Sequence, residues 1–281
     1  MQSLENRIIL VTGATDGLGK HVAAELAARG ATVLLHGRDR EKGNALLQTI
    51  ASDTGNRNLF YYNADFSSLD AVRRLAGEIT AAHERLDVLI NNAGTGAGVR
   101  GESREKSADG HELRLAVNYL APFCLTHRLL PLLRRSAAAR IVNVASVGQQ
   151  AIDFDDVMLA TGYDGLRAYR QSKLALVMFT FALADRLKGS GITVNTLHPA
   201  TLMNTKMVVE TDYFGGPLTT VTQGTQAVLY LAVAPDLGGM TGAYFDGRRR
   251  ARADAQAYDT QARRQLWTLS EQLTGIKEYG E

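Results

Sequence analysis

The sequence predicts an α/β fold, a three-layer, doubly wound arrangement around a mostly parallel sheet of seven strands. Short apolar runs that fit buried strands alternate with helix-length segments along nearly the whole chain. The segments between consecutive strands are long enough for the crossovers that parallel strands need. With 45% hydrophobic and 21% charged residues, the composition is that of a globular protein. No repeat or linker divides the chain, so we expect residues 1–281 to form a single domain.

The expected strands are short apolar runs. The first, Arg7–Thr12, is rich in β-branched residues and stops at Gly13, as a buried strand does before a tight turn. The others follow in chain order at Ala31–His36, Asn58–Ala64, Asp87–Asn91, Arg140–Ala145, Ile192–His198 and Gly242–Phe245.

The expected helices lie between these strands. Gly17–Arg29 carries Val22, Leu26 and neighbouring alanines on one face, and Gly30 ends it. Further helices are expected at Glu41–Ser52, Ser68–Ala82, Glu112–Leu133 with a break at Pro122, Tyr169–Lys188 and Thr220–Ala232.

The C-terminal segment shows one helical stripe, which predicts a helical extension at about residues 250–275. Its members are Tyr258, Ala262, Leu266, Leu269 and Leu273. We expect the stripe either to pack against the body of the domain or, together with Ala200–Pro217, to cover a substrate cleft. The basic run at residues 248–250 and 252 is expected to be a solvated helix start rather than a site for an acidic partner.

Charge and cysteine content exclude several classes of protein. The balance of 31 basic and 29 acidic side chains gives no reason to expect nucleic acid or an anionic membrane as the partner. A single cysteine, Cys124, excludes an internal disulfide and a multi-thiolate metal site, and no metal is expected. Met1–Arg7 does not read as a signal peptide, and Leu174–Ala184 is too short to span a bilayer. We therefore expect a cytoplasmic protein.

A glycine-rich turn joins the first strand to the first helix, and it is typical of a cradle for a dinucleotide pyrophosphate. Glycines allow the tight turn and the close approach of a phosphate, and the helix N-terminus attracts its negative charge. The candidate cofactor-binding residues in this turn are Gly13, Thr15, Asp16, Gly17, Leu18 and Gly19.

The end of the second strand indicates which dinucleotide is bound. An NAD site usually has a carboxylate there for the ribose hydroxyl, and none occurs in Ala31–Gly37. Arg38 follows at once, and a guanidinium pairs well with a 2′-phosphate, with His36 as a possible second contact. The sequence therefore favours NADP(H). The alternative is that Asp39 holds the ribose of NAD(H).

Three polar groups form a candidate catalytic set. Tyr169 and Lys173 are four residues apart on an expected helix, so they share one face. A nearby ammonium favours the phenolate and is expected to lower the pKa of Tyr169 toward working pH. Ser146 follows the fifth strand at the edge where open α/β sheets bind ligands, and its hydroxyl can donate to a substrate oxygen.

These motifs together resemble the short-chain dehydrogenase/reductase family, in its single-domain Rossmann-fold branch. The matching pieces are the segment 12–19, Asn91–Gly94, Asn118, Ser146, the segment Tyr169–Lys173 and His198–Pro199, in the family's order. The segments 168–175 and 37–39 look most like the retinol-dehydrogenase-like subgroup, whose members mostly use NADP(H) on hydrophobic carbonyls or alcohols. Two departures are Ala200, where glycine is common, and the acidic Asp16.

The resemblance implies a role for each position. Tyr169 is the general acid or base, Lys173 lowers its pKa and holds the nicotinamide ribose, and Ser146 binds the substrate oxygen. Asn118 holds a water in a proton relay. Further cofactor contacts are implied for Asp65, Phe66, Asn92, Ala93, Gly94, Pro199, Ala200 and Thr201, and Tyr163 is expected to be a substrate-loop residue.

The expected function is reversible reduction of a carbonyl to an alcohol on a small hydrophobic substrate. A non-catalytic NADP(H)-binding regulatory protein and a sugar or polyol dehydrogenase are the alternatives. Many relatives are dimers or tetramers, and the apolar segments Leu113–Leu133 and Leu174–Leu187 could pair with a second subunit.

Overall fold

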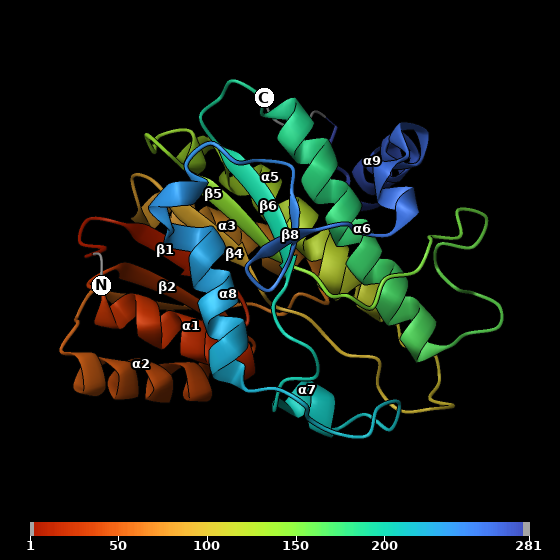
Figure 1. The fold of residues 1–281 in the computed structure, drawn as a ribbon, viewed down its shortest axis with the longest axis horizontal. Coiled ribbons are helices and arrows are strands. Elements are labelled where there is room, and N and C mark those ends of the chain that lie inside the picture. The colour runs from red at the N-terminus through yellow and green to blue at the C-terminus, as the bar shows by residue number, and fades with distance from the viewer. Residues whose placement is uncertain (1–2, 278–281) are drawn as a thin grey trace.

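The computed structural model describes residues 3–277, whose strands form a single twisted sheet (Figure 1). Its order is β3-β2-β1-β4-β5-β6-β7-β8, and all neighbours are parallel except β7 and β8. The strands are β1 (Ile8–Val11), β2 (Thr32–Gly37), β3 (Leu59–Asn63), β4 (Val88–Asn91), β5 (Arg140–Val144), β6 (Thr193–His198), β7 (Tyr244–Asp246) and β8 (Arg249–Ala251). The predicted doubly wound fold class is confirmed.

The position of β1 sets where a ligand can enter. Because β1 lies between β2 and β4, the connections from β1 and β4 leave toward opposite halves of the sheet. Such a switch point opens a crevice outside the carboxyl ends of the strands. The loops that follow β1, β4 and β5 therefore meet at one edge of the sheet.

The strand count is one higher than predicted. Strand β8 pairs antiparallel with β7, with Phe245 opposite Arg250, and Gly247 turns the chain with a φ of +59°. The prediction of a solvated helix start at residues 248–250 is wrong. The run is too short to show a period of its own, and exposed arginines are common on edge strands, where charge discourages further pairing.

The two faces of the sheet each carry a hydrophobic core because alternate residues of a strand point to opposite faces. Ile9 and Val11 of β1 pack with the helices on one face, while Leu10 packs on the other. All three side chains are fully buried, and each contributes roughly 1.5–3 kcal/mol by leaving water.

Helices cover both faces. α1, α2 and α8 pack on the Ile9 face, and α3, α5 and α6 pack on the Leu10 face. In Figure 1, α8 lies across the front of the strands, beside α1. The helices are α1 (Gly17–Ala28), α2 (Arg40–Thr54), α3 (Leu69–Ala82), α4 (Leu113–Leu115), the π-helix η1 (Ala116–Leu120), α5 (Ala121–Leu133), α6 (Gly165–Arg186), α7 (Lys206–Val209), α8 (Val221–Val233), the short 3-10 helices η2 (Pro235–Leu237) and η3 (Ala255–Tyr258), and α9 (Thr260–Thr274).

The helices predicted between the strands agree with the structure to within two residues, except at the start of α6. α6 begins at Gly165 rather than at Tyr169, because the carboxylate of Asp164 accepts from the Arg167 N–H at 2.7 Å and caps the helix one turn earlier. The predicted break at Pro122 takes the form of the π-helix η1, which ends just before it. Proline has no N–H, so the carbonyl of Asn118 lacks its usual donor four residues on.

Helix α9 of the predicted extension packs against the body of the domain. Its Trp267 ring lies 5.2 Å from Phe123 and 6.0 Å from Phe179, measured between ring centres. The Tyr119 hydroxyl, in η1, lies 2.5 Å from Ser270 Oγ. α9 thus covers part of α6, one of the two segments that we considered for pairing with a second subunit.

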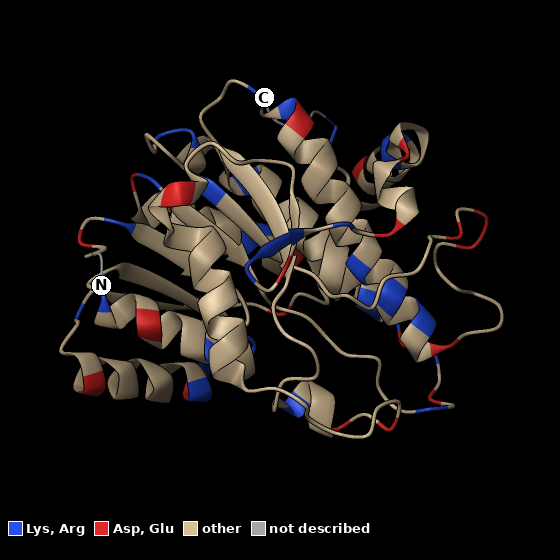
Figure 2. Cartoon of the chain, in the orientation of Figure 1, with Lys and Arg blue, Asp and Glu red and all other residues tan. Residues whose placement is uncertain are grey.

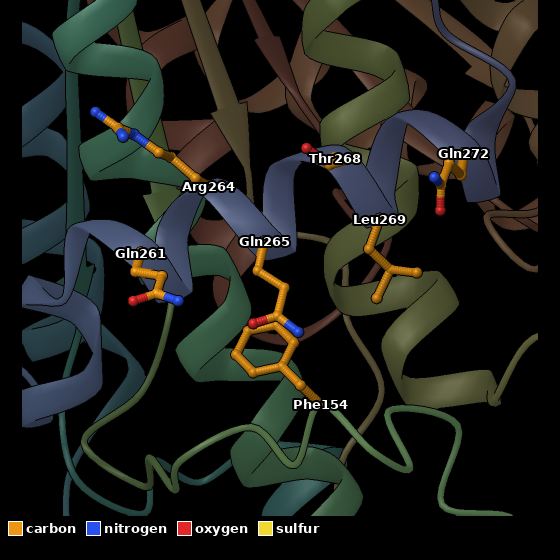
Figure 3. A pocket seen from close by; sticks show the side chains of 7 residues that line it. All are labelled: Phe154, Gln261, Arg264, Gln265, Thr268, Leu269 and Gln272. Atoms are coloured by element: carbon orange, nitrogen blue, oxygen red, sulfur yellow. The ribbon is translucent and has the colours of Figure 1, made fainter.

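A shallow hollow runs along the outer side of α9 (Figure 3). Figure 3 shows Gln265 on α9 and Phe154 in the segment after β5, both of which line it. Its described lining is Phe154, Gln261, Arg264, Gln265, Thr268, Leu269 and Gln272, none of which lines the larger cavity at the carboxyl edge. The interpretation of this helix as a cover over a substrate cleft is therefore not supported by its position.

Charged side chains are spread over many elements, with both signs intermixed (Figure 2). Within residues 3–277 no helix combines the length and apolar character needed to cross a bilayer. The same residues contain no group of three or more histidine, cysteine or acidic side chains arranged to hold a metal ion.

Candidate active site

A cavity of about 670 Å³ lies at the carboxyl ends of the parallel strands. Its walls come from the loops after β1 to β6 and from the segment 199–214, which includes α7. This is the crevice that the strand order opens.

The loop after β1 (residues 12–19, the glycine loop) is packed too tightly for side chains. A β-carbon at Gly19 would stand 2.2 Å from the carbonyl oxygen of Gly13, and one at Gly13 would stand 2.7 Å from Cα of Ala93. Asp16 caps α1 by accepting from the Gly17 N–H at 2.7 Å. The backbone therefore comes within reach of a ligand at the N-terminus of α1, which fits the pyrophosphate of a dinucleotide.

Thr12 ties the glycine loop to the loop after β4. Its Oγ1 accepts from the N–H groups of Asn92 at 2.9 Å and Ala93 at 3.0 Å. The Asn92 side chain donates in return to the Thr12 carbonyl at 2.8 Å. Two walls of the cavity are thus held at a fixed separation, which the sequence pattern did not reveal.

His36 holds the glycine loop through a hydrogen bond to its backbone. Its Nδ1 accepts from the Gly13 N–H at 3.3 Å, and its Nε2 donates to the carbonyl of Ala64 at 3.1 Å. The ring stacks on Phe66 with centres 4.2 Å apart, and burial lowers the pKa of His36 to about 4. At neutral pH this side chain is therefore uncharged and fully hydrogen-bonded, which does not support the expectation that it assists in binding a phosphate.

Arg38 and Asp39 have different roles at the end of β2. Arg38 lines the cavity, and it forms no ion pair with any residue from 3 to 277. The Asp39 carboxylate instead caps α2 by accepting from the Lys42 N–H at 3.0 Å, a bond that lowers the pKa of Asp39. The guanidinium is free to bind an anion, whereas the carboxylate already has a partner.

Gly94 allows Lys173 and Asn118 to approach the backbone after β4. A β-carbon at residue 94 would lie 3.0 Å from Asn118 Oδ1 and 3.4 Å from Lys173 Nζ. Lys173 Nζ also donates to the carbonyl of Val144, at the end of β5, at 3.1 Å. The ammonium group therefore lies between the ends of β4 and β5.

The side chain of Asn118 is fully engaged with its neighbours. Its amide donates to the Thr95 carbonyl at 3.0 Å and to Ser172 Oγ at 2.9 Å, and its Oδ1 accepts from the Thr95 N–H at 2.7 Å. These bonds join η1 to α6 and to the loop after β4. Asn118 is buried behind the cavity wall rather than lining the cavity.

Tyr169 lies on the cavity wall beside Ser146 and Lys173. Lys173 Nζ is 5.8 Å from the centre of the phenol ring. Burial raises the pKa of Tyr169, and a hydrogen bond with Ser146 acts in the opposite direction. Burial also lowers the pKa of Lys173 to about 8. The expected lowering of the phenol pKa is therefore not seen in the cofactor-free protein, where burial raises it.

A family model described as short chain dehydrogenase matches residues 7–213. The chain belongs to the short-chain dehydrogenase/reductase family. It is 38% identical to retinol dehydrogenase 13 of Homo sapiens over 291 residues, covering 98% of this chain and 86% of that protein. The chain is thus a retinol-dehydrogenase-like member of the family and an oxidoreductase that acts on an alcohol or carbonyl group.

Solved structures agree with this assignment. A crystal structure of an uncharacterized protein from Mycobacterium paratuberculosis is 30% identical, has a TM-score of 0.79, and covers 100% of this chain and 97% of its own. A short chain dehydrogenase from Shigella flexneri, complexed with NADP, is 32% identical with a TM-score of 0.73. That comparison covers 88% of this chain and 100% of the other.

Most site residues predicted from the sequence lie around one short-chain dehydrogenase cavity. Lining it are Gly13, Thr15, Asp16, Gly17, Leu18, Gly19, His36, Arg38, Asp65, Phe66, Asn92, Ala93, Gly94, Ser146, Tyr169, Lys173, Pro199, Ala200 and Thr201. Asn118 and Tyr163 are not among the described lining residues. The hydroxyl of Tyr163 instead donates to the Glu112 carboxylate at 3.2 Å, so its predicted contact with substrate is not supported.

Sequence reasoning missed several apolar residues of the lining. Leu113, Val117, Val147, Leu166, Met207 and Phe214 all face the cavity. Leu113 and Val117 are spaced by four residues, a signal that identifies a helix face but does not distinguish a core from a cavity wall. The segment 200–217 was considered as part of a cover over a substrate cleft, but no pattern in it indicated which side chains point inward.

Proposed function

We propose that this chain reversibly reduces a carbonyl to an alcohol on a small hydrophobic substrate with NADP(H). The main support is the position of the Tyr169 phenol, which is hydrogen-bonded with Ser146 and lies beside Lys173 on the cavity wall. The glycine loop and Arg38 line the same cavity. A proton donor and a dinucleotide cradle that share one cavity are the requirements for this chemistry.

A bound nicotinamide supplies the hydride in one direction and accepts it in the other. Tyr169 gives its proton to the substrate oxygen during reduction and takes it back during oxidation. Ser146 holds that oxygen through its hydroxyl and stabilises the charge that develops on it. Lys173, fixed by the Val144 carbonyl, places a positive charge close to the phenol and favours the phenolate once a proton has left.

Asn118 contributes through its backbone and its position. Its side chain holds the loop after β4, and its carbonyl has no N–H donor at residue 122. In our proposal this carbonyl binds the water that returns a proton toward Lys173.

Arg38 supports the preference for NADP(H). A guanidinium without a carboxylate partner at the end of β2 suits a 2′-phosphate, and a similar enzyme from Shigella flexneri is complexed with NADP. The alternative that Asp39 holds the ribose of NAD(H) is disfavoured, because the Asp39 carboxylate already caps α2.

The apolar lining supports a hydrophobic substrate. Leu166, Met207 and Phe214 line the same cavity as Tyr169, in a wall that also includes the charged residues Arg170, Lys206 and Glu210. The similarity to retinol dehydrogenase 13 supports the same class of alcohol or aldehyde. A polar sugar or polyol would leave hydroxyls unpaired against these apolar side chains.

The decisive experiment follows oxidation of NADPH by absorbance with a panel of hydrophobic ketones and aldehydes. We expect turnover that Tyr169→Phe abolishes while NADPH still binds. Tight NADPH binding by the wild type with no turnover on any carbonyl would support the non-catalytic alternative.

Two further expectations stay predictions. A cytoplasmic location is tested by fractionation of cells that express the full chain. A dimer or tetramer is tested by light scattering of the purified protein, and a monomer mass would contradict it.

A further inference from the structure

A buried arginine joins three segments beside the active site. Arg114, in α4, is 3% exposed, and its guanidinium donates to the carbonyls of Gly96 and Ala97, both at 2.8 Å. It also pairs with the Glu102 carboxylate and with the hydroxyl of Tyr163. We call Arg114, Glu102, Glu112 and Tyr163 the arginine hub.

One carboxylate of the arginine hub fixes the loop, and the other fixes the start of α4. Glu102 Oε2 accepts from the Val99 N–H at 3.0 Å, so the loop from residue 94 to 102 closes on itself. Glu112 Oε1 lies 3.9 Å from the guanidinium, and its Oε2 accepts from the Leu115 N–H at 2.6 Å at the start of α4. Each polar group of the hub thus has a defined partner, as buried charges require.

The start of α6 rests directly on this hub. A β-carbon at Gly165 would lie 2.3 Å from the carbonyl oxygen of Ala97, 3.1 Å from Glu102 Oε1 and 3.3 Å from Arg114 Nη2. Tyr169 follows Gly165 by four residues on the same helix. The position of the 94–102 loop therefore determines how closely the first turn of α6 can approach.

The segment after β6 rests on the other side of the loop. Thr211 Oγ1 donates to the Gly98 carbonyl at 2.7 Å, and Asp212 accepts from the Arg100 N–H at 2.8 Å. A β-carbon at Gly96 would stand 2.8 Å from Cγ of Met207, which lines the cavity. The loop thus lies between the hub and the segment 205–212, which forms part of the cavity wall.

We propose that Arg114 is a positioning residue for the proposed reaction. Through the 94–102 loop it sets the distance between the start of α6, which carries Tyr169, and the segment 205–212, which forms part of the cavity wall. Arg114 touches neither cofactor nor substrate, since it is not among the described residues that line the cavity. The inference rests on the proposed function, because it assigns a role in that reaction.

The test compares Arg114→Met with Arg114→Lys and with Arg140→Met in the full chain. Arg140 is a matched control because it is a partly buried arginine that donates to a carbonyl, that of Leu231, at 3.3 Å, and it begins β5 at the opposite edge of the sheet. The first readout is hydrogen exchange of the backbone amides of residues 95–102, which needs no turnover. The second is kcat and KM for the best carbonyl substrate.

In Arg114→Met we expect faster exchange across residues 95–102 and a loss of about 10- to 100-fold in kcat/KM, as expected for a misplacement near 1 Å. Arg114→Lys should recover only part of both effects, because a lysine cannot reach two carbonyls and a carboxylate together. Arg140→Met should lower the melting temperature without changing exchange in this loop.

Gly165→Ala leaves every side chain of the hub in place and tests the same contact from the side of α6, as a second variant beside Arg114→Met. Its β-carbon would stand 2.3 Å from the Ala97 carbonyl oxygen, so α6 must move away from the loop, and kcat of the folded protein should fall. Wild-type exchange and wild-type kcat/KM in Arg114→Met would overturn the proposal, as would equal effects in Arg140→Met. A wild-type protein that turns over no carbonyl would overturn the proposed function instead, and loop exchange would still report whether Arg114 holds the loop.

Discussion

His36 and Gly13 are joined by a hydrogen bond in which the imidazole Nδ1 accepts from the glycine N–H at 3.3 Å. The bond requires a neutral ring with its proton on Nε2, where the Ala64 carbonyl accepts it. Protonation of Nδ1 would therefore break the contact and place a charge in a buried site.

This relationship predicts a loss of stability in acid. The pKa of His36 is lowered from 6.5 to about 4, so between these values the unfolded chain binds a proton that the folded protein does not. The free energy of unfolding should then decrease by up to about 3 kcal/mol as the pH falls from 7 to 4. Urea titrations of the wild type and His36→Gln at both pH values measure it. The variant should show a shallower decrease, and equal decreases would contradict the assignment.

Tyr169→Phe should lower kcat by roughly 10²- to 10⁴-fold, because it removes the proton donor and leaves the cavity otherwise intact. Steady-state NADPH oxidation measures kcat, and fluorescence titration measures NADPH binding, which should change little. Tyr230→Phe is the matched control, since its phenol bonds Asp236 outside the cavity. Activity in Tyr169→Phe close to that of the control would contradict the proposed role.

Arg38→Ala should weaken NADPH binding and leave NADH binding nearly unchanged. A hydrogen bond to a charged group contributes about 1.5–3 kcal/mol, so the expected loss is roughly 10- to 100-fold in Kd. Titration with both cofactors measures the ratio of the two Kd values. An unchanged ratio would mean that Arg38 does not bind the 2′-phosphate, and that Asp39 or another residue contacts the ribose.

Gly13→Ala should weaken cofactor binding and destabilise the fold, while Gly55→Ala should only destabilise it. Both glycines have positive φ, +63° and +72°, so both substitutions strain the backbone by roughly 1–2 kcal/mol. Only the β-carbon at residue 13 meets a neighbour, Ala93 Cα at 2.7 Å, whereas residue 55 faces open space. Thermal melting and NADPH titration of both variants separate the two effects, and equal NADPH affinities would contradict a tight glycine loop.

Trp267→Ala should reduce the free energy of unfolding by about 3–5 kcal/mol, because it leaves a cavity between α9, α5 and α6. The KM of folded enzyme for a bulky substrate should stay at the wild-type value. Denaturant titration and kinetics at low temperature check the two statements. A raised KM at full folding would restore the interpretation of α9 as a cover over the cleft.

The sequence by itself determined the order of strands and helices, the glycine loop and the pair Tyr169 and Lys173. These signals are local: apolar runs, glycines at a strand-to-helix turn, and a spacing of four on a helix. It also indicated that the ligand edge lies at the carboxyl ends of the strands, because parallel strands joined by crossovers all end there.

Only the tertiary structure decided how the remaining residues act. The sequence suggested that His36 contacts a phosphate. In the structure its two ring nitrogens are hydrogen-bonded to Ala64, 28 residues away, and to Gly13, 23 residues away. The sequence suggested that Tyr163 contacts the substrate. In the structure its hydroxyl donates a hydrogen bond to Glu112, 51 residues away. The pKa of Tyr169 is raised by burial, which spacing along one helix does not encode. Contacts between residues far apart in the chain are set by packing, and no local pattern specifies them.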